Sequence, residues 1–270
     1  MLTLEGIKVM KKLIPVIVLV FGIFLLVPLS WAGTGTVSGV EVEPNQVLMG
    51  ASFNGARITV SGLIPAECEV LVRFLGAPQD LRLKKKGRAL GLLWMNMGAV
   101  YFHNAPGAFL LFPSRRLENF MREKKEEWDA MGLGFEGLKE QLNVSPASEN
   151  KDLLFAEFMK LRQKERLYGI IKNTVTYGKM EKEMKPFAAV LTLPPDIPQG
   201  AYRIEVFAIK GGKVISSQSR EIAAKEVGVP AMLASLAFEH GTLYGVIAVI
   251  VAVLAGLLSG LIFKGAKGAH

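Results

Sequence analysis

The chain has 270 residues, of which 50% are hydrophobic and 21% are charged, and its formal net charge is +8. This length allows one or two domains. The positive charge is mild and spread along the chain, which argues against a nucleic-acid partner. The single cysteine, Cys68, excludes an internal disulfide. The excess of apolar residues lies at the two ends, a pattern typical of membrane-engaging segments.

The N-terminus has the composition of a signal peptide. Three lysines precede an apolar run at residues 13–29, and Ser30 and Ala32 are the small residues expected before a cleavage site. We therefore interpret residues 1–32 as a signal peptide that is removed. An uncleaved signal anchor is the alternative.

Short apolar runs separated by turn residues predict an antiparallel β-sandwich. We place its first part at residues 33–112 and its second part at residues 170–226. The expected strands are 46–53, 57–61, 69–75, 89–96, 99–103, 108–112, 170–177, 187–193, 201–209 and 213–223.

One late strand indicates the type of sandwich. Apolar and polar residues alternate from Tyr202 onward, and Gly211 and Gly212 predict a two-residue hairpin turn. Tyr202 follows Gly200 at the start of this strand, which resembles the tyrosine corner of immunoglobulin-like sandwiches. The fold class is therefore predicted as mainly β and immunoglobulin-like. An ordinary alternating strand with a packed tyrosine is the alternative.

A helical insertion is expected at residues 113–169, between the two parts of the sandwich. Apolar residues recur there at helical spacing in two segments, with Ser114 and Ser148 as candidate N-caps. The first segment contains Leu117, Phe120, Met121, Trp128 and Met131, and the second contains Leu154, Phe158, Leu161 and Tyr168. The prediction is an insertion of two helices.

The C-terminal segment predicts one transmembrane helix. Residues 243–263 hold no charge, and about 20 apolar residues suffice to cross a bilayer. Lys264 and Lys267 follow directly, which places the tail at 264–270 in the cytoplasm by the positive-inside rule. Residues 227–242 are then a juxtamembrane linker. We therefore expect the main domain on the other side of the membrane from this tail.

Small residues recur every four positions within this helix. Ala248, Ala252, Gly256 and Gly260 form a ridge along one side, because four residues advance a helix by little more than one turn. Small side chains allow the close backbone approach on which helix association in a bilayer depends. The ridge predicts packing against an integral membrane protein or a second copy. The alternative is that Gly and Ala are simply common in such helices.

The densest charge in the chain is a basic cluster formed by Lys84, Lys85, Lys86 and Arg88. One interpretation is a contact to an anion or an acidic lipid head group. The other is a solvated hairpin tip with Gly87 in the turn.

No sequence motif indicates an enzyme or a cofactor. His103 has no second potential ligand at a spacing typical of metal sites. Cys68 lies in phase with the valines of its predicted strand, as expected of a small core residue. Glu43 and Asp80 would support a catalytic site only if the fold brought them together with His103. We expect no metal and no cofactor.

Six segments in the same order resemble the bacterial transmembrane protein family Alph_Pro_TM. They are FNGARITVSG, GLLWMN, VYFHNAPGAFLLFPSRRL, RLYG, LPPDIPQGAYRIEVF and the LYG that opens the terminal span. The resemblance implies a periplasmic domain with one C-terminal span, encoded beside sulfite-exporter-type permeases. It implies no catalytic residues.

These observations favour a non-enzymatic accessory or binding subunit of a membrane complex, associated with a small-anion permease of the sulfite type. A periplasmic enzyme with residues scattered in the sequence is one alternative. A self-associating structural protein of the cell envelope is the other.

Overall fold

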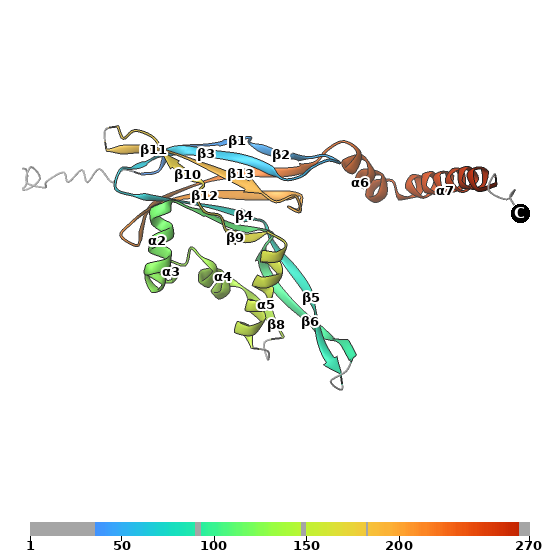
Figure 1. The fold of residues 1–270 in the computed structure, drawn as a ribbon, viewed down its shortest axis with the longest axis horizontal. Coiled ribbons are helices and arrows are strands. Elements are labelled where there is room, and N and C mark those ends of the chain that lie inside the picture. The colour runs from blue at the N-terminus through green and yellow to red at the C-terminus, as the bar shows by residue number, and fades with distance from the viewer. Residues whose placement is uncertain (1–35, 90–92, 147–149, 182, 265–270) are drawn as a thin grey trace, which may run out of the picture. The chain divides into compact units, whose positions relative to one another are not determined.

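The computed structural model describes residues 36–89, 93–146, 150–181 and 183–264. This part of the chain is mainly β, with three sheets, an insertion of helices and two helices toward the C-terminus (Figure 1). The expected signal peptide at 1–32 lies outside the described residues, and so does the tail after Lys264.

Four antiparallel strands form the first sheet, in the order β1 (Ser38–Glu43), β3 (Ala56–Pro65), β11 (Met184–Leu193) and β10 (Val175–Tyr177). Ten residues of β3 pair with β11 in an uninterrupted register from Ala56↔Leu193 to Pro65↔Met184. Alternate residues of both strands are buried, among them Ile58, Val60, Ala189 and Leu191. One face of this sheet therefore belongs to the core.

The second sheet has the order β2 (Gln46–Met49), β13 (Lys213–Glu226), β12 (Gly200–Lys210), β4 (Glu69–Gly76), β7 (Phe109–Pro113) and β9 (Tyr168–Ile170). Its two outer pairs, β2 with β13 and β7 with β9, are parallel, and the pairs between them are antiparallel. Gly211 and Gly212 both have positive φ, which confirms the predicted tight turn between β12 and β13.

The predicted tyrosine corner is present at the start of β12. Tyr202 Oη donates to the carbonyl of Pro198 at 2.6 Å, and its ring stacks on Phe74 with centroids 4.8 Å apart. The hydroxyl thereby ties the incoming loop to a strand of the core. This hydrogen bond and the two-layer arrangement of the sheets in Figure 1 are those of an immunoglobulin-like sandwich.

A long hairpin forms the third sheet, which the sequence did not predict in this form. Its strands are β5 (Pro78–Ala89) and β6 (Leu93–Pro106), with β8 (Asn143–Ser145) beside β6. The strand expected at 99–103 lies within β6, whereas the one expected at 89–96 includes both the end of β5 and the start of β6. The alternative of a turn at Gly87 was wrong, because Gly87 pairs with Met95 inside the hairpin. Polar side chains on a solvated edge strand conceal β5, because its pattern lacks an apolar alternation.

The insertion contains four helices among the described residues instead of the two expected. They are α2 (Arg115–Glu123), α3 (Lys125–Ala130), α4 (Phe135–Gln141) and α5 (Lys151–Lys164). Lys124, with φ −123° and ψ 56°, breaks the first expected helix into α2 and α3. Ser114 caps α2 as predicted, accepting from the backbone N–H of Leu117. Asn150 caps α5, and the predicted cap Ser148 lies outside the described residues.

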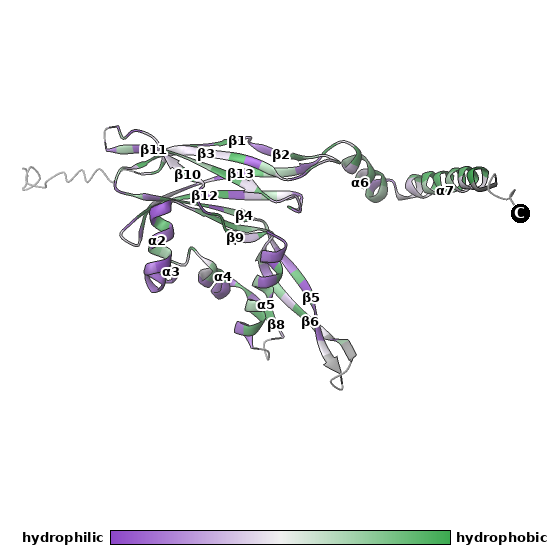
Figure 2. Cartoon of the chain, in the orientation of Figure 1, coloured by the Kyte–Doolittle hydropathy of each residue, from purple (hydrophilic) through white to green (hydrophobic). Residues whose placement is uncertain are grey.

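The chain leaves the sandwich through α6 (Val229–Glu239), with Pro230 in its first turn, and continues as α7 (Gly241–Lys264). The span predicted at 243–263 lies within α7. Figure 2 shows both helices as predominantly hydrophobic, in contrast to the mixed colouring of α2 to α5. The predicted linker at 227–242 is therefore mostly helix.

Candidate functional site

The predicted basic cluster lies in the second half of β5, where Gly87 pairs with Met95 and does not form the expected turn. Lys84 pairs with Ala99 and Lys86 with Asn96, so that Met97 and Gly98 together face Lys85 across a β-bulge. Gly98 has φ +132°, a conformation that glycine adopts without strain. Arg88 continues the same strand, opposite Trp94.

A groove runs between this hairpin and helix α5. The volume of this groove is about 610 Å³, which is within the range of small-molecule sites. The basic cluster contributes Lys84, Lys85 and Lys86 to one side of it. The remaining lining residues are Leu83, Val100, Phe102, Leu153, Leu154, Glu157, Phe158 and Leu161.

The floor of the groove is hydrocarbon. Phe102 of β6 and Phe158 of α5 are both buried and stack with ring centroids 4.5 Å apart. Above them Leu153 and Leu161 remain 61% and 37% exposed. Exposed leucines beside a concave apolar floor are typical of binding surfaces.

The charges around this groove are unequal. Among the described residues that line it, Glu157 is the one carboxylate, and Lys160 on the same helix engages it at 2.6 Å. Within the described part of the chain, neither Lys84 nor Lys86 forms an ion pair. The β5 side of the groove is therefore positive.

Arg162, near the C-terminal end of α5, and Tyr168, at the start of β9, join this part of the chain to the base of the hairpin. Arg162, only 7% exposed, donates through Nη2 to the carbonyl of Gly107 at 2.5 Å and through Nη1 to Glu165 at 2.8 Å. Tyr168 donates to the neighbouring carbonyl of Pro106 at 2.7 Å. These contacts hold the two walls of the groove in place at the base of the hairpin.

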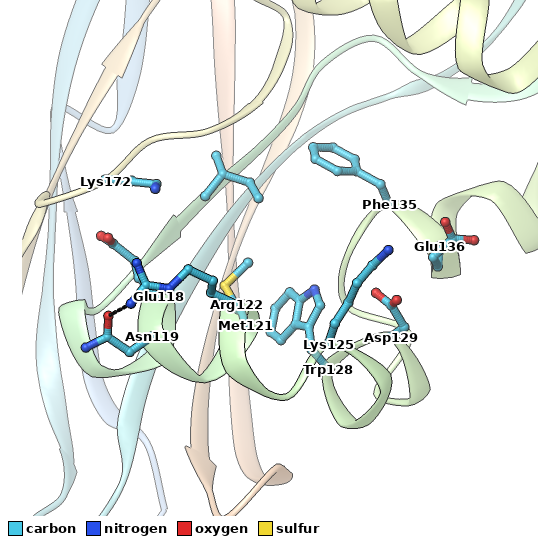
Figure 3. A pocket seen from close by; sticks show the side chains of 11 residues that line it. Glu118, Asn119, Met121, Arg122, Lys125, Trp128, Asp129, Phe135, Glu136 and Lys172 are labelled. Carbon is cyan, nitrogen blue, oxygen red and sulfur yellow. Dashed lines mark hydrogen bonds between the residues drawn. The ribbon is translucent and has the colours of Figure 1, made fainter.

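A second cavity of about 440 Å³ lies between α2, α3, α4 and the end of β9 (Figure 3). Trp128 and Phe135 form its apolar wall, while Glu118, Arg122 and Lys172 stand around it. Its lining includes three acidic and three basic side chains, Glu118, Asp129, Glu136, Arg122, Lys125 and Lys172. The formal charges of this lining therefore cancel.

His103 and Asp80 are brought together, but Glu43 is not part of their cluster. His103 Nδ1 lies 3.1 Å from Asp80 Oδ2, and the backbone N–H of Asn104 donates to Asp80 Oδ1. These two hydrogen bonds, the His103 bond first, hold the pKa of Asp80 below its ordinary value. His103 and Asn104 together face Asp80 across a second bulge of β6, and Asn104 has φ 59°. The pair thus stabilises a bulge on the solvated side of the hairpin.

Cys68 is a core residue, as its alternation predicted. It is buried, and burial raises the pKa of its thiol. A thiol with a raised pKa is a poor nucleophile at neutral pH. Over the ranges that the structure covers, no three His, Cys, Asp or Glu side chains gather in a position to hold a metal ion.

Helix α7 exposes its whole surface along Gly241–Ile262, with a mean hydropathy of 2.7. Ala248, Ala252, Gly256 and Gly260 lie on it as the sequence placed them, and a Cβ added at Gly256 or Gly260 would meet no other atom. The helix is long and apolar enough to cross a membrane.

Together these features define a mainly β protein with an immunoglobulin-like sandwich and one candidate membrane-spanning helix. The chain belongs to the family described as Putative transmembrane protein (Alph_Pro_TM), whose sequence model matches residues 39–265. The match extends from the first strand through α7, so it includes the sandwich, the insertion and the span. A comparison with curated proteins gave no match.

Proposed function

We propose that this protein is a single-span accessory or binding subunit of a complex in the bacterial inner membrane. Its sandwich and insertion face the periplasm, its C-terminus lies in the cytoplasm, and it carries out no catalysis of its own. The lysines at positions 264 and 267 support this orientation, because positively charged flanks remain on the cytoplasmic side.

The observation that carries the proposal is the unpartnered ridge on α7. Within the described residues nothing packs on this helix along its apolar length. In a bilayer, helices associate through close packing of small residues, and Gly256 and Gly260 form a G-x-x-x-G pair. The ridge offers such a surface to a second helix.

The partner is an integral membrane protein. Among integral membrane proteins, the family resemblance favours a permease for a small anion of the sulfite type as this partner. The extramembrane part then contributes binding surfaces, since two open grooves border its insertion while His103, Asp80 and Glu43 form no common site.

A pull-down from native membranes in mild detergent tests the proposal. Wild type is compared with Gly256→Leu plus Gly260→Leu, which places bulk on the ridge. The matched control is Leu254→Phe plus Leu258→Phe, which adds bulk about half a turn away on the opposite side of the helix. All variants are first compared for abundance in the membrane fraction.

We expect a second membrane protein to copurify with wild type and with the control, and to be lost with the ridge variant. If all three proteins are recovered alone and monomeric, the proposal is wrong. If they are recovered as homo-oligomers that only the ridge variant disrupts, the ridge mediates self-association and the accessory role is wrong.

A further inference from the structure

We propose that the groove between the β5–β6 hairpin and α5 binds a single-chain anionic amphiphile, of which a long-chain carboxylate is the simplest. This inference goes beyond the proposed function, because it concerns the extramembrane domain and does not depend on what packs against α7. It rests on two observations taken together. The floor of the groove is apolar, and lysines give its β5 side a positive charge.

The apolar half of the groove matches a hydrocarbon chain. Val100, Phe102 and Phe158 are buried beneath it, and Leu153 and Leu161 remain partly exposed along its α5 wall. An acyl chain laid over this floor removes those leucines and its own methylenes from water. The wall is maintained without a ligand, because Arg162 of α5 is bonded to the base of the hairpin and so is Tyr168 of β9, the strand that follows the helix.

The charged half matches an anionic head group. Lys84 and Lys86 lie on the β5 rim, and Glu157, the only carboxylate among the described residues that line the groove, is engaged by Lys160. The bulge opposite Lys85 interrupts the regular register at this place. A head group at the rim would meet two ammonium groups while its chain lay in the groove.

Lysines on an edge strand also have a simpler role, since they discourage edge-to-edge pairing. That role accounts for the charges of β5 but not for the exposed leucines of α5 that face them. A peptide is a less suitable occupant of the α5 side. The backbone N–H and C=O groups of α5 are hydrogen-bonded within the helix, so they cannot pair with the backbone of a peptide. A peptide backbone buried against that wall would lose its hydrogen bonds to water, whereas a hydrocarbon chain has none to lose.

Photolabelling of the full chain in phosphatidylcholine nanodiscs tests the inference. The probes are a long-chain fatty acid with a photoreactive group in its chain and the corresponding uncharged fatty alcohol. Labelled peptides are identified by mass spectrometry. We expect the acid to label peptides of α5 and of the β5–β6 hairpin about tenfold more than the alcohol does, as two lysines near an anion allow.

Two variants separate the charged half from the apolar half. Lys84→Glu plus Lys86→Glu should reduce labelling by the acid about tenfold. Lys179→Glu plus Lys213→Glu changes the net charge equally at exposed lysines outside the groove and should leave labelling unchanged. Leu153→Gln removes an exposed leucine with little effect on folding and should reduce labelling by both probes.

Three results would overturn the inference. In the first, both probes label only α7, as bulk lipid would. In the second, acid and alcohol label the groove equally and the Lys84→Glu plus Lys86→Glu variant behaves like its matched control. In the third, a soluble acidic peptide displaces the acid probe as well as unlabelled oleate does, which would assign the groove to a protein segment.

Discussion

Ser114 donates a hydrogen bond to Glu69, with 2.7 Å between Ser114 Oγ and Glu69 Oε2, and this contact joins the start of α2 to strand β4. The same carboxylate oxygen accepts from Tyr177 Oη of β10 at 2.8 Å. Tyr177 Oη in turn accepts from the backbone N–H of Val70. Because β10 and β4 belong to different sheets, this network ties both layers of the sandwich to the first helix of the insertion.

Replacing Ser114 by alanine should destabilise the protein by about 1–3 kcal/mol, because it removes an N-cap and leaves the half-buried Glu69 carboxylate with one donor fewer. Ser114 is fully buried. The measurement is chemical unfolding of the full chain in detergent. Ser217→Ala, at an exposed position of β13, is the matched control and should change the free energy of unfolding by less than about 0.5 kcal/mol. Equal effects of both variants would contradict this role of Ser114.

Tyr202→Phe should cost about 1 kcal/mol, the net value of one hydrogen bond. The substitution removes the donor to the Pro198 carbonyl but keeps the ring that stacks on Phe74. Tyr101→Phe removes a hydroxyl from a more exposed ring of the hairpin and serves as the control. Thermal unfolding of the two variants checks the prediction. A Tyr202→Phe protein as stable as the control would show that the corner contributes nothing.

Alkaline pH should destabilise the sandwich through Tyr202. Burial raises the pKa of this tyrosine from 10.0 to about 12, so the folded state holds the phenolic proton more tightly than the unfolded state does. Its contribution to stability is therefore fully present below pH 10 and is lost as the pH rises toward about 12. Unfolding free energies measured across this range should fall, and tyrosinate absorbance should report the titration.

The Tyr202→Phe variant should show a shallower fall over the same range. A remaining slope is expected, because burial also raises the pKa of Tyr168 and Tyr177. Identical slopes for wild type and variant would mean that Tyr202 does not contribute to the pH dependence.

Arg162→Met should destabilise the protein by about 2–3 kcal/mol and loosen the α5 wall of the groove, because the Gly107 carbonyl loses a buried charged donor. Lys160→Met, at an exposed position of the same helix, should cost at most about 0.5 kcal/mol. Hydrogen exchange of α5 and β6, measured beside chemical unfolding, distinguishes a local loosening from a global loss. Unchanged protection in the Arg162→Met protein would be inconsistent with this anchoring.

The sandwich could be predicted from local patterns where one face of a strand is buried. β12 alternates as expected, its turn contains Gly211 and Gly212, and Tyr202 makes the corner. The break between α2 and α3 and the helix α4 could not be predicted, because tertiary contacts fix these boundaries. Gly134 packs against the indole of Trp128, and an added Cβ at Gly137 would lie 2.2 Å from the Gly132 carbonyl oxygen. A pattern of apolar spacing does not report such contacts.

By itself the sequence determined the apolar span, its small-residue ridge and the basic cluster at Lys84, Lys85 and Lys86, because each depends only on residues close together in the chain. The tertiary structure alone decided what the cluster faces. Pairing of β5 with β6 and the anchoring of α5 by Arg162 place the lysines beside Leu153 and Leu161, which lie far along the chain. Hydrophobic attraction is not directional, so local sequence cannot specify which distant apolar surface a charged strand borders.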